Sequence, residues 1–533
     1  MALKLSHPTH LLMLYALGLC LAVYSVVCLA AVHQRAVMSP LLFIRNIARL
    51  LAIAAFAPLT AALEATHGVA AGDVTADSAV IWSRADQDAQ LVVTYGPATG
   101  TVQMKEAKAR ARAVDDFTAQ VLLTQLMPDT AYRYEARFVR RGRKSSALAG
   151  LFRTAPMPTD KRSVALIWSG DLAGQRYCRR PDIGYRIFDP MRRLRADFFV
   201  ANGDMIYADG DCPAAGMESG WENIPANFPG IGNPSVDWED PVAVYEVFNA
   251  HWRYNREDRF FQAFLASTPI YVQWDDHEVI NDFGARSGTY PPQPDRAGFA
   301  NVVAAGRKSM FDYHPIVRNA VEPGRIYRQF RWGAHVELFI VDARSYRSDN
   351  ADKDSEGKTM LGEIQLAWLK AGLAASDATW KIVSSDVPLS VPTGSRASEF
   401  GRDAFAGGTS ETGFEHELLD LVEHMDTANI DNVVFVATDV HSAAQLRYER
   451  DYNGDGDQLL FHELIAGPLS AIRGPAPVTL DATLGPVMVY GEGGIFNFGA
   501  IQVDAANGAR LSTDIRDEFG LVRPGSERVL EPD

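Results

Sequence analysis

The chain has 533 residues, enough for two or more domains at roughly 100–200 residues each. Its hydrophobic fraction of 47% and charged fraction of 22% are typical of a globular protein. The formal net charge of −15 leaves no basic footprint for nucleic-acid binding, and four cysteines in so long a chain exclude a disulfide scaffold.

Two apolar stretches open the chain and predict targeting to a membrane or across it. The first, residues 11–32, carries no charge and is long enough to span a bilayer, which takes about 20 residues. The second, residues 50–63, follows arginines and ends among small residues, as a secretory signal peptide does. Either the first stretch anchors a precursor, or Met38 is the real start and an ordinary signal follows it. We therefore expect residues 1–65 to be a targeting or anchor region and the globular part to be exported, to the periplasm or outside the cell.

Residues 66–155 predict a small all-β, fibronectin-like sandwich. Apolar and polar residues alternate with a period of two between Gly, Pro and Asp, which is the pattern of short half-buried strands. Leu126, Pro128, Thr130 and Tyr132 together resemble a fibronectin-type corner, with a tyrosine at the start of the penultimate strand. No catalytic constellation falls in this segment, so we interpret it as an accessory domain. The strand candidates are residues 78–82, 91–95, 119–124 and 131–138.

A boundary near Thr154–Pro158 precedes a layered α/β domain, which we place at residues 160–510. Near-continuous apolar runs predict buried strands, and helical periodicity separates several of them. The strand candidates are residues 164–168, 197–201, 269–274, 336–341, 380–384 and 432–438. The helix candidates are residues 183–194, 361–374 and 413–425. We expect residues 511–533 to be a C-terminal tail.

Aspartates and histidines follow four of these apolar runs directly. They are Asp171, Asp204, Asp276, His277, Asp439 and His441. Ligands of open α/β sheets bind outside the carboxyl ends of the strands, so we expect these side chains to meet. Their oxygens and nitrogens suit divalent or trivalent cations, and Asp204 could bridge two of them with its two oxygens. Two metals about 3.5–4 Å apart would clamp a phosphate and activate water, and a histidine would protonate the leaving alkoxide.

The sequence around these residues resembles the PhoD-like alkaline phosphatase/phosphodiesterase family, within the calcineurin-like metallophosphoesterase superfamily. The matching segments are Ser169–Gln175, Asn202–Gly210, Trp274–Val279, Val341–Tyr346, Gln365–Leu369 and Thr438–His441. The resemblance covers residues 66–499 and includes the fibronectin-like domain. It implies an enzyme that hydrolyses phosphate monoesters, diesters or both at a dinuclear or trinuclear metal site.

The resemblance also implies a role for each motif residue. Asp204 would bridge the metals, and Asp439 and His441 would be ligands from the last strand. Asp276 takes the place of a metal-binding asparagine of the wider superfamily. His277 would contact the phosphate or act as the general acid, so the predicted catalytic residues are His277 and Asp204.

The implied cofactors are Ca²⁺ and Fe³⁺, with another divalent metal as the alternative. Tyr207 would bind the iron as a phenolate, unless it is a buried aromatic residue with a satisfied hydroxyl. Better-known members carry a cysteine ligand just after the first strand, where this sequence has Ser169-Gly-Asp171. We expect Asp171 to replace that cysteine, which would change the potential of the iron and the choice of metal. Cys178 is the less favoured substitute. If the protein is exported, Cys178 could instead form a disulfide with Cys212, and the sequence leaves this pairing open.

Two further residues or segments leave alternatives open. Arg344 follows a buried strand and binds either the substrate phosphate or a structural carboxylate. Asp451–Asp457 resembles the start of an EF-hand loop, but the twelfth position, which needs a bidentate glutamate, holds His462. We therefore predict a polar hairpin turn at residues 451–457.

An exported phosphoesterase acting on a phosphate-ester substrate is the leading functional hypothesis. The alternatives are a degenerate protein that only binds phosphate ligands and a redox enzyme with an iron–tyrosinate centre. The N-terminal segment leaves a membrane anchor open, and the sequence leaves the oligomeric state open.

Overall fold

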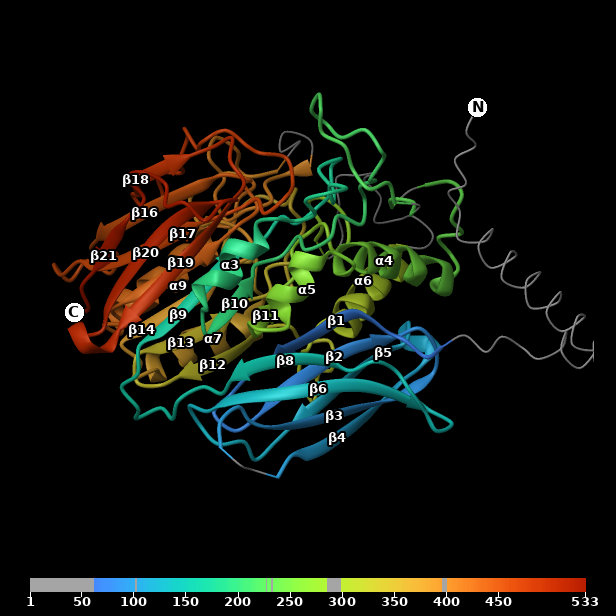
Figure 1. Cartoon of the computed structure of the whole chain (residues 1–533). Coiled ribbons are helices and arrows are strands. Elements are labelled where there is room, and N and C mark those ends of the chain that lie inside the picture. Colours follow the sequence, from blue (N-terminus) through green and yellow to red (C-terminus); the bar gives the residue numbers. More distant parts are fainter. Residues whose placement is uncertain (1–61, 101–102, 227, 232, 285–298, 395–399) are drawn as a thin grey trace, which may run out of the picture. The chain divides into compact units, whose positions relative to one another are not determined.

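The computed structural model describes residues 62–533 apart from residues 101–102, 227, 232, 285–298 and 395–399 (Figure 1). Leu63–Asp533 form one compact unit. The first predicted targeting stretch, residues 11–32, lies wholly outside the described residues, and of the second, residues 50–63, only residues 62 and 63 are described. Within the described residues, no helix has both the length and the apolar character needed to cross a membrane.

The first large sheet has nine strands, and its centre is parallel. Its spatial order is β21 (Arg528–Leu530), β20 (Arg510–Asp517), β19 (Asn497–Asp504), β9 (Val164–Ser169), β10 (Phe198–Ala201), β11 (Ile270–Val272), β1 (Ala65–Gly72), β2 (Ala79–Ala85) and β5 (Thr118–Leu123). Strands β9, β10 and β11 pair in parallel, so their carboxyl ends lie at one edge.

The second large sheet has seven strands. Its spatial order is β12 (Arg328–Trp332), β13 (Val336–Ile340), β14 (Trp380–Ser384), β15 (Val433–Ala437), β17 (Leu459–Ile465), β16 (Ala443–Arg450) and β18 (Val487–Glu492). Strands β13, β14, β15 and β17 are parallel.

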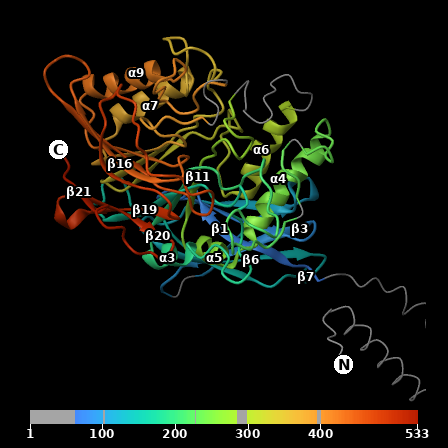
Figure 2. The ribbon, with the colours of Figure 1, turned by 90° about the horizontal axis from the view of Figure 1, so that it is seen from above.

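The two sheets pack face to face between layers of helices. Phe198 and Trp332 come from different sheets, and their ring centroids lie 4.8 Å apart in the shared core. Because side chains alternate along a strand, Phe199 points to the opposite face of β10 and joins the core formed with the helices there. Figure 2 shows α3 and α5 on one side of the sheets and α7 and α9 on the other. This is the predicted layered α/β arrangement.

The helices divide between the two outer faces. The outer face of the nine-stranded sheet forms a core with residues of α3 (Phe188–Leu194), α4 (Pro241–Arg256), α5 (Arg259–Leu265) and α6 (Phe299–Tyr313). The outer face of the seven-stranded sheet forms a separate core with residues of α7 (Glu363–Ala375) and α9 (Glu415–Thr427). Each fully buried large apolar side chain contributes about 1.5–3 kcal/mol relative to exposure, so these faces supply much of the stability.

The N-terminal β-structure shares a sheet with the α/β part. One sheet of it holds β4 (Lys105–Ala111), β3 (Ala89–Pro97), β6 (Ala131–Arg140) and β7 (Arg143–Lys144), with β8 (Leu148–Arg153) beside β6 (Figure 1). The facing strands β1, β2 and β5 continue the nine-stranded sheet, because β1 pairs in parallel with β11 through Gly72 and Ile270. The boundary expected near Thr154–Pro158 therefore does not divide the nine-stranded sheet, which contains strands from both sides of it.

The expected C-terminal tail is wrong. Residues 511–533 supply most of β20 and all of β21, at the edge of the nine-stranded sheet. The reason is visible in the alternation of β20, where Leu511, Thr513 and Ile515 are buried against the sheet core.

Residues 451–457 form the predicted polar hairpin turn. They connect β16 and β17, which pair in antiparallel fashion. The Asp451 carboxylate accepts hydrogen bonds from the backbone N–H groups of Gly454, at 2.6 Å, and Gly456, at 3.0 Å. The carboxylate thus stabilises the turn itself.

The tyrosine corner of the N-terminal sandwich is present. The Tyr132 hydroxyl accepts a hydrogen bond from the Met127 backbone N–H at 2.8 Å. Tyr134, two residues further along β6, is equally buried, but its hydroxyl has no hydrogen-bond partner.

This pair gives a matched test of the corner. We expect Tyr132→Phe to lower the free energy of unfolding by about 1–3 kcal/mol, because it leaves a backbone donor unsatisfied. We expect Tyr134→Phe to be neutral or stabilising, because it removes an unpaired buried hydroxyl. Denaturant unfolding of both variants measures the difference, and equal losses would contradict the assignment of the corner.

Candidate metal centre

The predicted site residues meet at the carboxyl ends of the parallel strands. Asp171 follows β9, Asp204 follows β10, and Asp276 and His277 follow β11. Asp171, Asp204 and Asp276 are at most 2% exposed, and His277 is 7% exposed. The loop after β15 adds Asp439 and His441 from the second sheet, and both are half-buried.

Asp204 belongs to two groups of ligand-type atoms. One group is Asp171, Asp204 and His441, and the other is Asp204, Asp276 and His277. Within each group, one atom from each residue lies within 4.8 Å of the others. A carboxylate shared between two such groups has the placement that bridging of two cations requires.

The backbone is unusual where these side chains leave the strands. Asp171, Asp204, Asp439 and His441 all have positive φ, at 56°, 53°, 71° and 54°. This left-handed conformation is costly for residues other than glycine and is concentrated at functional sites. Gly203 has φ of 115°, and a Cβ there would lie 2.4 Å from the Asp275 side chain. Glycine is therefore needed for the close approach of the loops after β10 and β11.

Glu278 and Asp209 support the site, and neither was predicted from the sequence. The Glu278 carboxylate accepts from the backbone N–H groups of Asp204, Met205 and Asp275 at 2.9, 2.7 and 2.9 Å. Asp209 Oδ1 lies 2.6 Å from His277 Nδ1. Asp209 lies inside the family-like segment Asn202–Gly210, and Glu278 lies inside Trp274–Val279. Their place in these segments was the only feature of the sequence that pointed to a role at the site.

The surroundings of His441 fix which of its nitrogens faces the site. His441 Nδ1 lies 2.6 Å from the carbonyl oxygen of Ile472, so Nδ1 carries the proton. Its Nε2 faces the site and lies 2.9 Å from the Tyr207 hydroxyl and 3.7 Å from Asp171 Oδ1. A neutral imidazole oriented by a backbone carbonyl is the usual form of a metal-ligating histidine.

The carboxyl groups of the centre are poorly compensated. Burial raises the pKa of Asp171 and of Asp439, and burial together with the neighbouring Asp276 and Asp275 raises the pKa of Asp204 well above its usual range. Among the described residues, Oδ1 of Asp171, Oδ1 of Asp276 and Oδ2 of Asp439 accept no hydrogen bond. Crowded, buried carboxylate oxygens that accept no hydrogen bond fit a bound cation, which offsets both the repulsion and the desolvation.

Tyr207 and His277 lie over the same centre. Tyr207 is 1% exposed, and its ring centroid lies 4.2 Å from that of His277. Burial and the nearby Asp204 and Asp171 raise the pKa of Tyr207 well above its usual range. Burial alone would lower the pKa of His277, but Asp209 and Asp276 raise it to about 10.

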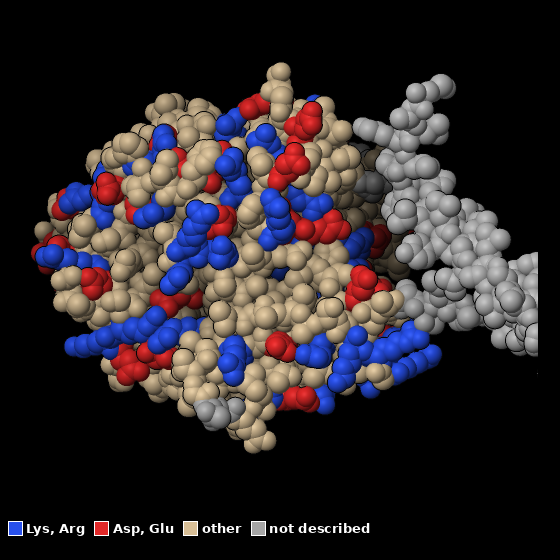
Figure 3. Space-filling model, viewed as in Figure 1, with Lys and Arg blue, Asp and Glu red and all other residues tan. Residues whose placement is uncertain are grey.

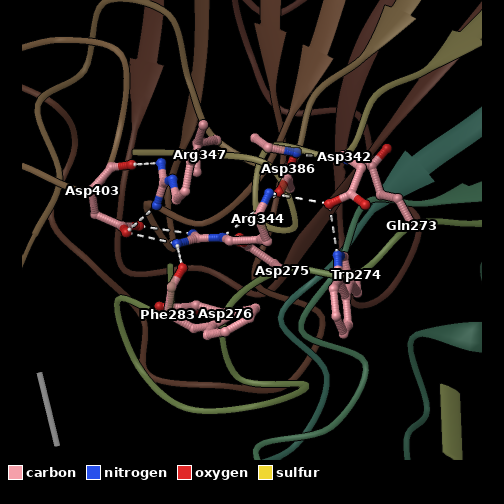
Figure 4. A network of polar contacts seen from close by, with 12 residues as sticks. Gln273, Trp274, Asp275, Asp276, Phe283, Asp342, Arg344, Arg347, Asp386 and Asp403 are labelled. Atoms are coloured by element: carbon pink, nitrogen blue, oxygen red, sulfur yellow. Dashed lines mark hydrogen bonds and ion pairs between the residues drawn. The ribbon is translucent and has the colours of Figure 1, made fainter. Parts of the chain in front are cut away.

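Arg344 pairs with carboxylates and does not line the pocket. Its side chain is fully buried and donates to Asp275 Oδ1 at 2.7 Å and to both oxygens of Asp403 at 2.6 and 2.8 Å (Figure 4). These contacts favour the structural-carboxylate alternative for Arg344 over the substrate-binding one. The guanidinium is the counterion of Asp275, which precedes the candidate ligand Asp276.

A third acidic group, Asp276, Asp282 and Asp403, lies beside the centre. Asp403 also accepts from Arg347 at 2.8 Å. Burial would raise the pKa of Asp403, but Arg344 and Arg347 lower it to about 2. Two guanidinium groups already neutralise Asp403, so Asp403 itself needs no further cation.

A pocket of about 610 Å³ opens over the centre. Its floor holds Asp204, Asp276, His277, Asp439 and His441. Its walls combine apolar and polar residues and include Val391–Gly394, Arg402, Gly408, Thr409 and Pro475–Thr479.

Comparison with known families accounts for both parts of the chain. The PhoD-like phosphatase domain matches residues 166–489, and the PhoD-like phosphatase N-terminal domain matches residues 52–156. The chain belongs to the PhoD-like phosphatase family. It is therefore a metallophosphoesterase-like protein of a family that hydrolyses phosphoric esters.

Individual relatives agree with the family assignment. Alkaline phosphatase D of Bacillus subtilis (strain 168) is 22% identical over 436 residues, which are 76% of this chain and 69% of that protein. A solved structure of PhoD shares the fold with a TM-score of 0.69 at 18% identity, over 89% of this chain and 90% of that one. A purple acid phosphatase from yellow lupin (Lupinus luteus) seeds has a TM-score of 0.57 at 13% identity, over 88% of this chain and 75% of that one.

Cys178 and Cys212 form a disulfide, with their Cα atoms 5.8 Å apart. The pairing that the sequence left open is therefore made. It also removes Cys178 as a thiolate substitute for the cysteine ligand that the resemblance implies, so Asp171 remains the expected replacement.

The metal centre predicts how stability depends on cations. We expect cation binding at about one hundred times the dissociation constant to stabilise the wild-type protein by about 3 kcal/mol, which a chelator would remove. Asp204→Asn should lose this cation-dependent stabilisation, because Asp204 belongs to both groups of ligand-type atoms. Without cations, Asp204→Asn should unfold at a higher temperature than the wild type, because it removes a repelled buried carboxylate. Thermal unfolding with and without chelator measures both effects.

Asp377→Asn is the matched control, because Asp377 is 90% exposed and lies on the surface beside Arg331. It should respond to the chelator as the wild type does. Equal cation-dependent stabilisation of wild type and Asp204→Asn would contradict the metal assignment.

Arg344 has a prediction that separates its two roles. Breaking a buried ion pair by removing one partner costs about 3–5 kcal/mol, so Arg344→Ala should be strongly destabilised. A substrate-binding arginine would instead raise KM and leave the unfolding temperature unchanged. Unfolding and steady-state kinetics of Arg344→Ala, with Arg344→Lys as the variant that keeps the charge, decide between them.

Proposed function

We propose that this chain is an exported phosphoesterase that hydrolyses phosphate monoesters, diesters or both at a site with at least two cations. The observation that carries the proposal is the position of Asp204, shared between Asp171 with His441 and Asp276 with His277. Membership of the PhoD-like phosphatase family supports ester hydrolysis over the redox alternative.

The residues that would hold the cations fall on two sides of Asp204. Asp171, His441 and Tyr207 lie on one side, where an oxygen-rich set with one phenol suits Fe³⁺. Asp276 lies on the other side, and Asp439 completes the floor, where carboxylates suit Ca²⁺ or another divalent metal. Bound cations would supply Lewis-acid polarisation of a phosphoryl oxygen and lower the pKa of a water molecule.

His277 is placed to handle the proton that ester cleavage requires. Its Nδ1 is held by Asp209, and its ring lines the pocket floor. The negative charge of Asp209 favours the protonated imidazole, which can donate from Nε2 to a leaving alkoxide. Asp209 thus positions the ring, and His277 is the general acid.

Export is supported by the Cys178–Cys212 disulfide, since such bonds form and persist in oxidising compartments. The predicted targeting region, residues 1–65, would provide the signal or the membrane anchor. On the face drawn in Figure 3, acidic and basic side chains are interspersed, so neither charge alone covers that face.

The role of His277 can be tested through the leaving group. We expect His277→Ala to lower kcat by about 10²–10⁴-fold for an alkyl phosphate, because the alkoxide then leaves without a proton. The loss should be much smaller for a nitrophenyl ester, whose leaving group needs no proton. Asp209→Asn should show the same pattern more weakly.

Metal content by elemental analysis should stay at the wild-type level in His277→Ala. His416→Ala is the control, because His416 is an exposed histidine that also pairs with a carboxylate, that of Asp354. An equal loss of kcat for alkyl and nitrophenyl esters would contradict the general-acid role. Phosphate binding without any hydrolysis would favour the degenerate binding protein.

A further inference from the structure

Arg402 is the one lysine or arginine among the described residues that line the pocket. The floor beneath it is acidic, and the wall formed by Pro475–Thr479 is largely apolar. A substrate phosphate would carry negative charge into this acidic pocket, so a fixed cation on the wall has a direct electrostatic consequence.

Arg402 differs from the other arginines near the centre in what it contacts. Its Nε donates to the carbonyl oxygen of Gly407 at 2.9 Å, and its Nη1 to that of Thr393 at 3.5 Å. In the part of the chain that the structure describes, it makes no ion pair, whereas Arg344 and Arg347 are both paired with Asp403. Arg402 is also half-buried, so its charge faces the pocket without an acidic partner.

The wall that carries Arg402 is braced at several points. The Arg402 backbone N–H donates to Thr412 Oγ1 at 3.0 Å. Gly408 N–H donates to Asp481 Oδ2 at 2.9 Å, and Asp481 N–H donates to the Ser390 carbonyl oxygen at 2.8 Å. These bonds fix the loops that line the pocket. Together with the contacts of Nε and Nη1 to the Gly407 and Thr393 carbonyl oxygens, they hold the guanidinium in place before a substrate binds. Preorganisation of this kind lowers the entropic cost of binding.

We propose that Arg402 binds the phosphate group of the substrate. Its guanidinium donates hydrogen bonds to phosphoryl oxygens from the wall, opposite the acidic and histidine floor. Planar guanidinium groups suit this task because two parallel N–H groups match two oxygens of one phosphate. The role extends the proposed function and rests on it, and it replaces the one that the sequence analysis considered for Arg344.

Direct titration of inorganic phosphate into the full-length, metal-loaded protein tests this without requiring turnover. We expect Arg402→Ala to weaken phosphate binding by about 10- to 100-fold, the effect of one charge-assisted contact, and Arg402→Lys to recover part of the loss. In kinetics, KM for a phosphate ester should rise by a similar factor, with a smaller change in kcat. Arg510→Ala is the control, because Arg510 is exposed and pairs with Glu531 on the surface.

Unchanged phosphate affinity in both Arg402 variants would overturn the proposal. So would loss of bound metal in Arg402→Lys, because Arg402 would then act through the metal centre. A wild-type protein that binds phosphate through Arg402 but hydrolyses no ester would contradict the proposed function and leave this binding role in place.

Discussion

Buried carboxylates need a positive partner, and this constraint organises the whole centre. Asp171, Asp204, Asp275, Asp276 and Asp403 are all at most 2% exposed and lie in one region at the ends of the strands. Without compensation, such a cluster would destabilise the fold through repulsion and desolvation. Arginine side chains compensate part of the cluster, because Arg344 and Arg347 neutralise Asp403 and Arg344 also neutralises Asp275. No arginine compensates the carboxylates around Asp204 in this way among the described residues, so we place the metal centre there.

The fold explains why the carboxylates gather in one place. Parallel strands β9, β10 and β11 end at one edge, and β15 of the facing sheet brings Asp439 and His441 to the same region. Close packing of the loops depends on Gly203, and the left-handed backbone at Asp204 turns its carboxylate inward. Glu278 then ties the loops after β10 and β11 together through three backbone N–H groups. Stability and chemistry therefore depend on the same short segments.

The sequence predicted the layered fold and the meeting of Asp171, Asp204, Asp276, His277, Asp439 and His441, because strand periodicity and strand ends are local signals. It did not predict the fate of Arg344, since its partner Asp403 lies in a distant loop without a motif. Nor did it settle the Cys178–Cys212 pair, because loop conformation decides that distance. The continuation of the nine-stranded sheet into the N-terminal sandwich was missed for a similar reason, since it depends on a single pairing of Gly72 with Ile270. The prediction of a C-terminal tail at residues 511–533 was wrong although the alternation of apolar and polar residues in β20 is present in the sequence.

Anomalous X-ray scattering from crystals of the metal-loaded protein tests the metal centre most directly. Two anomalous peaks are expected about 3.5–4 Å apart, one on each side of the Asp204 carboxylate. One peak should lie beside Asp171 and His441, and the other beside Asp276. A metal bound away from Asp204, or a fully loaded crystal with no peak at this carboxylate, would contradict the central claim that cations complete the charge balance of the buried cluster.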